Sequence, residues 1–265
     1  MNGQAPASAT TCASTSPPTS APTAAILLIG SELLSGRTQD ANLQYIGTRL
    51  VERGIRLRQA RVIADEHETI VAAVNELRAG HDLLFTTGGI GPTHDDITAD
   101  AVAAAVGVPV ELHAEARRRL QAYADRRGYT LDEDTLRMAR IPVGATLIDN
   151  PVSAAPGFRL ANVLVMAGVP SIVRGMLDGV YETLPSGARV GSVSVAVFDR
   201  GESAIAAPLR ALQARYPAVD IGSYPGRLDG RSRVELVARS DDAEQLLAVE
   251  GELQALVDAL PEPRR

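Results

Sequence analysis

The 265-residue chain contains no lysine, so all 26 of its basic residues are arginines. Without lysine the protein cannot form a Schiff base, which excludes pyridoxal enzymes and class I aldolases. The phosphate-binding lysine of P-loop NTPases and the strand lysine of protein kinases are missing too. Any phosphate must therefore be bound by backbone N–H groups, by arginine or through a metal ion.

Other residue types are scarce as well. There is no tryptophan, and the one cysteine, Cys12, excludes an internal disulfide, an iron–sulfur site and a four-thiolate zinc site. With 32 acidic against 26 basic residues the net charge is −6, which argues against a nucleic-acid partner. No apolar run approaches the about 20 residues of a membrane span, and the N-terminus does not resemble a signal peptide. We expect a cytoplasmic protein.

The remaining pattern predicts three regions. Residues 1–23 contain Ser, Thr, Ala and Pro without charge, and we interpret them as a disordered leader. Residues 24–185 alternate apolar strands with amphipathic helices, which predicts an α/β fold with a mostly parallel sheet and helices on both faces. Residues 186–265 are typical of a small βαββα unit. The expected strands are 24–29, 55–64, 82–87, 145–149, 157–160, 162–166, 191–198, 219–224 and 232–239, and the expected helices are 40–53, 67–79, 98–106, two within 112–140, 170–184, 202–215 and 241–260.

The segment TTGGIGPTHDDIT, at 86–98, lies between a predicted strand and a predicted helix. Its three glycines allow backbone N–H groups to approach a phosphate closely, and its threonines add hydroxyl donors. Two adjacent carboxylates would repel a phosphate unless a divalent cation lay between them. The segment therefore predicts metal-bridged phosphate binding, although a tight turn with an aspartate helix cap is the simpler alternative. The candidate residues are Thr87, Gly88, Gly89, Gly91, Thr93, Asp95, Asp96 and Thr98.

Two further segments should lie at the same sheet edge, because each is next to a predicted strand. In IGSELLSGRTQDAN, Glu32 is a candidate ligand contact, general base or metal ligand, and its polar neighbours could bind a ligand. An ordinary loop with a helix cap is equally compatible. In NPVSAAPGF, small residues could close over the edge or could only form turns. The candidates from the two segments, besides Glu32, are Ser31, Ser35, Asn42, Ser153, Pro156 and Gly157.

With the segment AGVPSIVRGML, these stretches resemble the molybdopterin-binding (MoaB/Mog-like) domain. The resemblance is closest to its version in the competence/damage-inducible (CinA-like) family, and it extends to a part of some FAD synthases. It covers 24–185 and, more weakly, the tail to about 260. It implies a three-layer α/β fold, a homodimer or homotrimer, and a phosphorylated pterin or nucleotide bound at the sheet edge. It also implies that the C-terminal deamidase domain of many CinA-like proteins is missing.

The resemblance leaves three functions open. Mog-like domains adenylylate molybdopterin with magnesium and ATP, whereas CinA-like proteins are associated with metal-dependent hydrolysis of pyrophosphates. The acid pair resembles the CinA-like form and favours a pyrophosphatase acting on an ADP-ribose-, FAD- or CoA-like diphosphate. Asp95 and Asp96, with Glu32 as a further catalytic candidate, would then hold Mg²⁺, Mn²⁺ or Co²⁺. Ile172 stands where CinA-like proteins usually have glutamate, which favours a non-catalytic regulatory binder as the third reading.

Overall fold

The computed structural model describes residues 21–188 and 190–260. Most of the expected leader, residues 1–20, lies outside the described residues. Thr23 already belongs to the first strand, which therefore starts one residue before the expected start at 24. Its backbone N–H and its hydroxyl both donate to the Asp82 carboxylate, at 2.8 and 2.7 Å. This long-range pairing, which no local pattern in the sequence reveals, holds the start of the strand in the fold.

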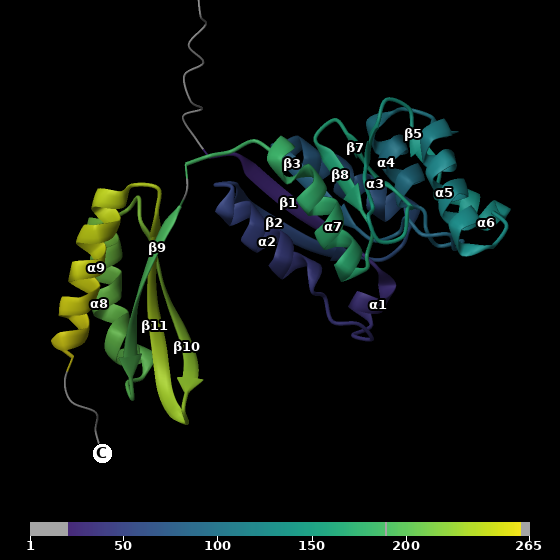
Figure 1. Ribbon diagram of the computed structural model, residues 1–265. Coiled ribbons are helices and arrows are strands. Elements are labelled where there is room, and N and C mark those ends of the chain that lie inside the picture. Colours follow the sequence, from purple (N-terminus) through teal and green to yellow (C-terminus); the bar gives the residue numbers. More distant parts are fainter. Residues whose placement is uncertain (1–20, 189, 261–265) are drawn as a thin grey trace, which may run out of the picture.

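Six strands form the larger sheet, in the order β2-β1-β3-β8-β7-β6. Strands β2, β1, β3 and β8 run parallel, β7 is antiparallel to β8, and β6, being antiparallel to β7, runs in the same direction as those four. The expectation of a mostly parallel sheet is therefore confirmed (Figure 1). The strands are β1 (Thr23–Ile29), β2 (Arg56–Ile63), β3 (Leu83–Thr87), β6 (Thr146–Ile148), β7 (Gly157–Leu160) and β8 (Val163–Met166).

Helices cover both faces of this sheet and give three layers. Successive side chains of a strand point to opposite faces, and β1 is apolar at every position from Ala24 to Ile29. Its even-numbered residues pack against α2 (Asn42–Glu52) and α7 (Pro170–Val180). Its odd-numbered residues pack against α3 (His67–Gly80), α4 (Thr98–Val106) and α5 (Ala114–Arg127). The continuous apolar sequence follows from this burial on two sides.

Helix boundaries follow local signals to different degrees. Helix α4 has the expected bounds, because Gly107 adopts the left-handed conformation (φ 82°) that ends a helix. The helix expected at 170–184 ends earlier, at Val180, and one turn of 3₁₀ helix follows. The short pair β4 (Val110–Leu112) and β5 (Arg140–Pro142) was not expected, since three residues carry no readable period. The remaining elements are α1 (Ser31–Leu34) and α6 (Glu133–Arg137).

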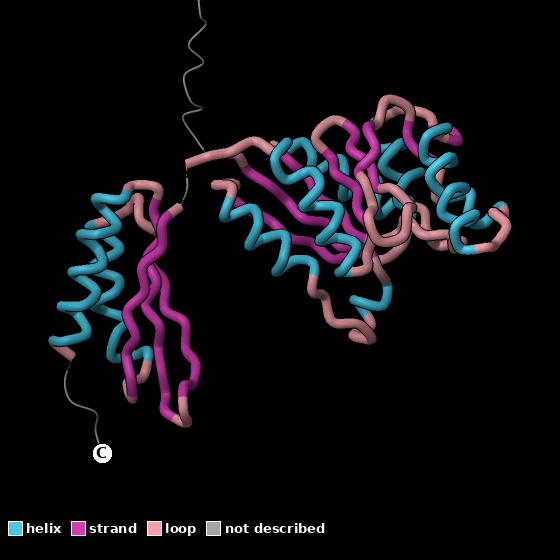
Figure 2. The backbone as a smooth tube through the Cα atoms, in the orientation of Figure 1, coloured by secondary structure: helices cyan, strands magenta, loops and turns pink. Residues whose placement is uncertain are grey.

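The C-terminal part forms a separate three-stranded antiparallel sheet in the order β10-β11-β9. Figures 1 and 2 show α8 and α9 together on one face of this sheet. Buried Val195, Leu236 and Leu253 belong to the core between the sheet and these helices. The expected βαββα order is confirmed, with β9 (Gly191–Phe198), α8 (Glu202–Arg215), β10 (Asp220–Leu228), β11 (Arg231–Ser240) and α9 (Ala243–Asp258). Within 21–188 and 190–260, no helix is long and apolar enough to cross a membrane.

Candidate functional site

The carboxyl ends of β1, β3 and β8 meet at one edge of the larger sheet. In the strand register, Leu28 pairs with Thr87 and Thr87 with Met166, so the loops that follow start side by side. They enclose an open cleft of about 550 Å³. Its lining comprises Ile29, Glu32, Thr38, Asp65, the stretch 88–92, Asp95, Asp96, Met138, Asn150, Ser153, Ala155, the stretch 167–170 and Ile172. The three sequence segments therefore meet at one site, as expected for ligand sites in open α/β sheets.

The glycine turn at the centre of the cleft is fixed by tight packing. Gly88 and Gly89 have φ angles of 103° and 66°, in the left-handed region that favours glycine. A Cβ on Gly88 would collide with the carbonyl oxygen of Ile29. The buried Thr98 closes the turn: its hydroxyl donates to the Gly88 carbonyl and its N–H to the Gly89 carbonyl, both at 3.0 Å. Thr98 therefore shapes the turn and lies beneath the lining.

The two adjacent aspartates have different surroundings. Asp96 Oδ2 accepts hydrogen bonds from the N–H and the hydroxyl of Thr93, at 2.8 and 2.6 Å, and so holds the loop together. Asp95 is exposed, and its own backbone N–H and the nearby His94 lower the pKa of its carboxyl, whereas the single hydroxyl proton of Thr93 is donated to Asp96. His94 itself is almost fully exposed, with Nδ1 at 4.0 Å from Asp95 Oδ1. Asp95 thus remains a negative charge directed to solvent at neutral pH.

On the opposite wall, Glu32 lies in the first turn of α1 and lines the cleft. A Cβ on Gly30 would lie only 2.5 Å from Glu32 Oε1, so the carboxylate folds back over that glycine. Asp65, which follows β2, accepts hydrogen bonds from the N–H and the hydroxyl of Ser31, at 2.7 and 3.0 Å. Ser31 is therefore used to connect two loops. Ser35 donates to the backbone oxygen of Glu32 at 3.2 Å and does not line the cleft.

Two asparagines hold the remaining walls in place. The side chain of the buried Asn42 donates to the carbonyl oxygen of Gly168 at 2.8 Å, which ties the first loop to the turn before α7. Asn150 donates to Ser153 Oγ at 2.7 Å and to the Ala155 oxygen at 2.9 Å. It also accepts hydrogen bonds from the backbone N–H groups of Val152 and Ser153. Both asparagines position loops that a ligand would contact.

The predicted site residues therefore divide into two groups. Those that line the cleft are Glu32, Gly88, Gly89, Gly91, Asp95, Asp96 and Ser153. Those that lie outside its lining are Ser31, Ser35, Asn42, Thr87, Thr93, Thr98, Pro156 and Gly157. Thr87 and Gly157 are buried within β3 and β7, and Pro156 lines a smaller adjoining hollow. The second group supports the site through packing and hydrogen bonds, whereas the first faces the open space.

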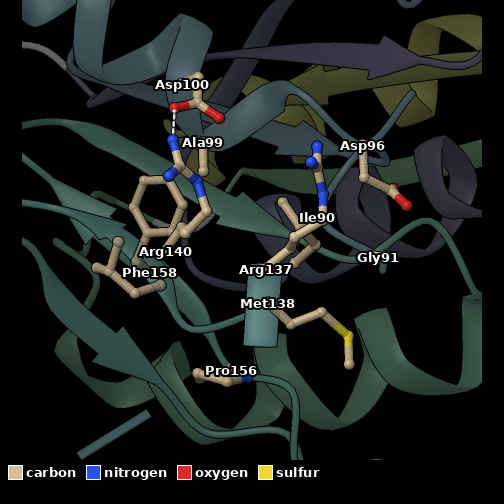
Figure 3. A pocket seen from close by; sticks show the side chains of 12 residues that line it. Ile90, Gly91, Asp96, Ala99, Asp100, Arg137, Met138, Arg140, Pro156 and Phe158 are labelled. Atoms are coloured by element: carbon tan, nitrogen blue, oxygen red, sulfur yellow. Dashed lines mark hydrogen bonds and ion pairs between the residues drawn. The ribbon is translucent and has the colours of Figure 1, made fainter. Parts of the chain in front are cut away.

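Sequence reasoning missed two features of the site. Asp65 could have been found, because it follows a parallel strand that ends at this sheet edge. Arg137 and Arg140, which line the adjoining hollow (Figure 3), come from the second helix expected within 112–140 and from a three-residue strand that no sequence pattern marked. Arg37, the nearest arginine in the motif sequences, does not line the cleft.

The described lining of the cleft is acidic. It contains the carboxylates of Glu32, Asp65, Asp95 and Asp96, and no arginine. Even so, no group of three or more His, Cys, Asp or Glu side chains in the part of the chain that the structure describes is placed to hold a metal ion. Mg²⁺ usually binds through one or two carboxylates together with phosphate oxygens and water. Asp95 and Asp96 fit that role, with the bound ligand supplying the other oxygens.

Comparison with known proteins identifies the larger sheet with a family. Residues 25–186 match the family described as "Probable molybdopterin binding domain", and residues 194–262 match the one described as "FAD synthase, middle domain". A protein of Aeropyrum pernix is 34% identical over 239 residues, which cover 86% of this chain and 89% of that relative. A CinA-like protein of Desulfosudis oleivorans is 36% identical over 209 residues, which cover 75% of this chain. The match covers 51% of that CinA-like relative, so the chain spans about half of its length.

Among solved structures, the protein CinA of Thermoplasma acidophilum, described as having unknown function, superposes with a TM-score of 0.57. It is 29% identical and covers 62% of this chain and 99% of its own. The family match and this likeness confirm the resemblance drawn from the four sequence segments. The chain belongs to the molybdopterin-binding (MoaB/Mog-like) domain family and is similar to its CinA-like members.

Proposed function

We propose that the cleft binds a phosphorylated nucleotide or pterin through a divalent cation and hydrolyses a diphosphate bond there. The observation that carries this proposal is the composition of the lining. Glycine N–H groups suited to a phosphate lie beside Asp95 and Asp96, and no arginine belongs to the described lining. A diphosphate in such a site needs a cation to offset the repulsion between its charge and the carboxylates.

The roles follow from what each residue has available. The backbone N–H groups of Gly89, Ile90 and Gly91 would bind phosphate oxygens, because the glycines leave room for a close approach, whereas the Gly88 N–H already donates to the Met166 carbonyl oxygen. Asp95 and the remaining oxygen of Asp96 would hold the cation. Because Asp95 and Asp96 are assigned to the cation, Glu32 on the opposite wall is the candidate to accept the proton of the attacking water. When bound, the metal would supply charge neutralisation and a more acidic water.

The test is binding and turnover of ADP-ribose, FAD and CoA with Mg²⁺, Mn²⁺ or Co²⁺. Calorimetry should show binding that disappears with EDTA, and chromatography should show release of a nucleoside monophosphate or phosphopantetheine. Binding without release under every pairing would contradict hydrolysis and leave a regulatory binder. Tight binding that survives EDTA would contradict the cation bridge.

A pterin ligand is the second candidate, because the matched family is described as molybdopterin-binding. The half-buried Ile172 lines the cleft where CinA-like proteins usually carry glutamate, so one carboxylate of the pyrophosphatase form is replaced by an apolar group. Pterin fluorescence in the purified protein, or transfer of AMP from ATP to molybdopterin, would favour this candidate. Their absence, with turnover of ADP-ribose, would favour the first.

Family membership also supports assembly as a homodimer or homotrimer, which we include in the proposal. Light scattering after size exclusion measures the mass directly. A mass of one chain at micromolar concentration would contradict it.

A further inference from the structure

A second, smaller hollow lies next to the cleft. Its volume of about 20 Å³ is enough for one water-sized group. We call this smaller adjoining cavity the back hollow. Arg137 and Arg140 line it and do not belong to the lining of the cleft. The residues that both cavities share are Gly89, Ile90, Gly91, Asp96 and Met138. The glycine turn expected to bind phosphate therefore borders both spaces.

The two arginines of the back hollow differ in their partners. Arg140 Nη2 lies 2.6 Å from Asp100 Oδ1, and this ion pair is the dashed line in Figure 3. Within residues 21–188 and 190–260, Arg137 forms no ion pair and its Nε has no hydrogen-bond partner, although that atom is buried. The charge of Arg140 is thus matched, whereas that of Arg137 is not.

A buried guanidinium N–H without an acceptor loses its hydration and gains nothing in return. Such groups are uncommon in folded proteins, where buried polar atoms are nearly always hydrogen-bonded to protein or water. Because the hollow and the cleft share lining residues, the guanidinium of Arg137 lies next to the glycine turn where we expect an anionic ligand to bind. Asp96 also lines the hollow, but among the described residues it forms no ion pair with Arg137, whose Nε stays without a partner.

We propose that Arg137 is an anion-binding residue of this site, whose guanidinium binds a phosphate oxygen of the ligand at the glycine turn. This inference rests on the proposed function. A planar guanidinium suits phosphate because its N–H groups can donate two parallel hydrogen bonds. It also provides the positive charge that the described lining of the cleft lacks. The arginine that serves the site then comes from α6, a hundred residues away from Arg37 in the chain.

The experiment compares Arg137→Gln with Arg140→Gln, which removes a guanidinium from the same hollow. Calorimetry with ADP-ribose and Mg²⁺ measures affinity, and adenosine serves as the probe without phosphate. Arg137→Gln should weaken ADP-ribose binding about tenfold or more, since it removes charge-assisted hydrogen bonds. Adenosine binding should stay unchanged, and Arg140→Gln should weaken ADP-ribose binding less than about threefold.

Other results of these binding measurements would contradict the role of Arg137 or the proposed function. Wild-type affinity in Arg137→Gln would overturn the role of Arg137 and leave water as its partner. Equal losses in both variants would attribute the effect to packing of the hollow and overturn it too. If the wild-type protein binds neither phosphorylated nucleotide nor pterin, the proposed function fails and this inference with it. If Arg137→Gln does not fold, Arg137→Lys keeps the charge without the planar fork, and unchanged ADP-ribose affinity there would overturn the proposal.

Discussion

The two sheets of this protein use the same residue types in different ways. Strands β3 and β8 of the larger sheet are buried at every position, and helices cover both faces. Strand β9 of the smaller sheet alternates between buried and accessible residues, because helices cover one face only. Parallel neighbours end at the same edge, whereas antiparallel neighbours end at opposite edges. Only the larger sheet can therefore gather several strand ends into one site.

Arg137 can be compared with two arginines of the smaller sheet. On the smaller sheet, Arg231 lies over the ring of Phe198 at 4.9 Å and Arg239 over that of Tyr224 at 5.5 Å. These stacks satisfy the guanidinium groups without any ligand. At the back hollow of the larger sheet, Arg137 has no such contact among the described residues. The Nε atoms of Arg200 and Arg233 in the C-terminal part are also buried without a partner, so the proposal for Arg137 depends on its position next to the cleft as well.

The largest expected effect tests burial. Phe85→Ala in β3 removes a fully buried ring between the sheet and the layer of α2 and α7, and we expect a loss of about 3–5 kcal/mol of unfolding free energy. Phe198→Ala in β9 removes a half-buried ring and should cost about 1 kcal/mol. Urea unfolding, followed by hydrogen exchange in each sheet separately, measures both losses. Similar losses would show that the open face of the smaller sheet is covered in solution.

The same contrast explains what the sequence could predict. The continuous apolar run at 24–29 predicts a strand that is buried on both faces, and the alternating pattern at 191–198 predicts a strand that is buried on one face. Both strands were predicted within one residue because local composition determines them. The β4–β5 pair was missed because its register depends on α5 and α6, which lie between the two strands in the chain. Its three-residue members carry no signal of their own.

The site was predictable to the extent that it follows strand ends. Glu32, Gly88 and Asp95 directly follow or lie near buried strands, and all three line the cleft. Asn42 was predicted as a ligand contact, yet its side chain donates to Gly168, 126 residues later. Partners at such distances depend on how the loops pack, and a single sequence does not contain that information.

The next effect concerns the glycine turn. Gly88→Ala forces a left-handed alanine and a collision with the Ile29 carbonyl, so we expect a loss of roughly 2–4 kcal/mol together with loss of ADP-ribose binding. Gly230→Ala in the β10–β11 hairpin is the matched control, with φ 78° and no atom within 4 Å of the added Cβ. It should cost roughly 1 kcal/mol by thermal unfolding and leave binding intact. Equal costs would mean that the collision relaxes freely.

A smaller effect separates two aspartates with similar local geometry. Asp96 accepts from Thr93 in the cleft, and Asp242 accepts from the N–H groups of Glu244 and Gln245 at the start of α9, both at 3.0 Å. Asparagine keeps these acceptors and removes the charge. Asp96→Asn should therefore weaken Mg²⁺-dependent ADP-ribose binding by about tenfold, or 1.4 kcal/mol, while Asp242→Asn leaves it unchanged. Calorimetry measures these affinities. If Asp96→Asn binds ADP-ribose with Mg²⁺ as tightly as the wild type, the proposed metal role of Asp96 is wrong.

The smallest effect is electrostatic and depends on pH. Arg118 and Arg119 lower the pKa of the Glu115 carboxyl on α5 from 4.5 to about 2. Because the folded-state value is the lower one, protons bind preferentially to the unfolded chain. The stabilisation is therefore fully present above pH 4.5 and disappears as the pH falls towards 2. In Glu115→Gln, the melting temperature should match that of the wild type near pH 2 and lie slightly below it above pH 4.5.

Glu252 on α9 gives the counterpart in the smaller unit, where the Tyr216 hydroxyl and then Arg215 lower the pKa of its carboxyl. Glu252→Gln should show the same sign, with a loss that appears only as the pH rises above the folded-state pKa. Melting curves from pH 2 to 6 measure both variants. Their differences from the wild type should shrink in 1 M salt, because both carboxylates are accessible to solvent and screened there. A difference that stays constant across the pH range would mean that side-chain packing, and not charge, is lost in the variant.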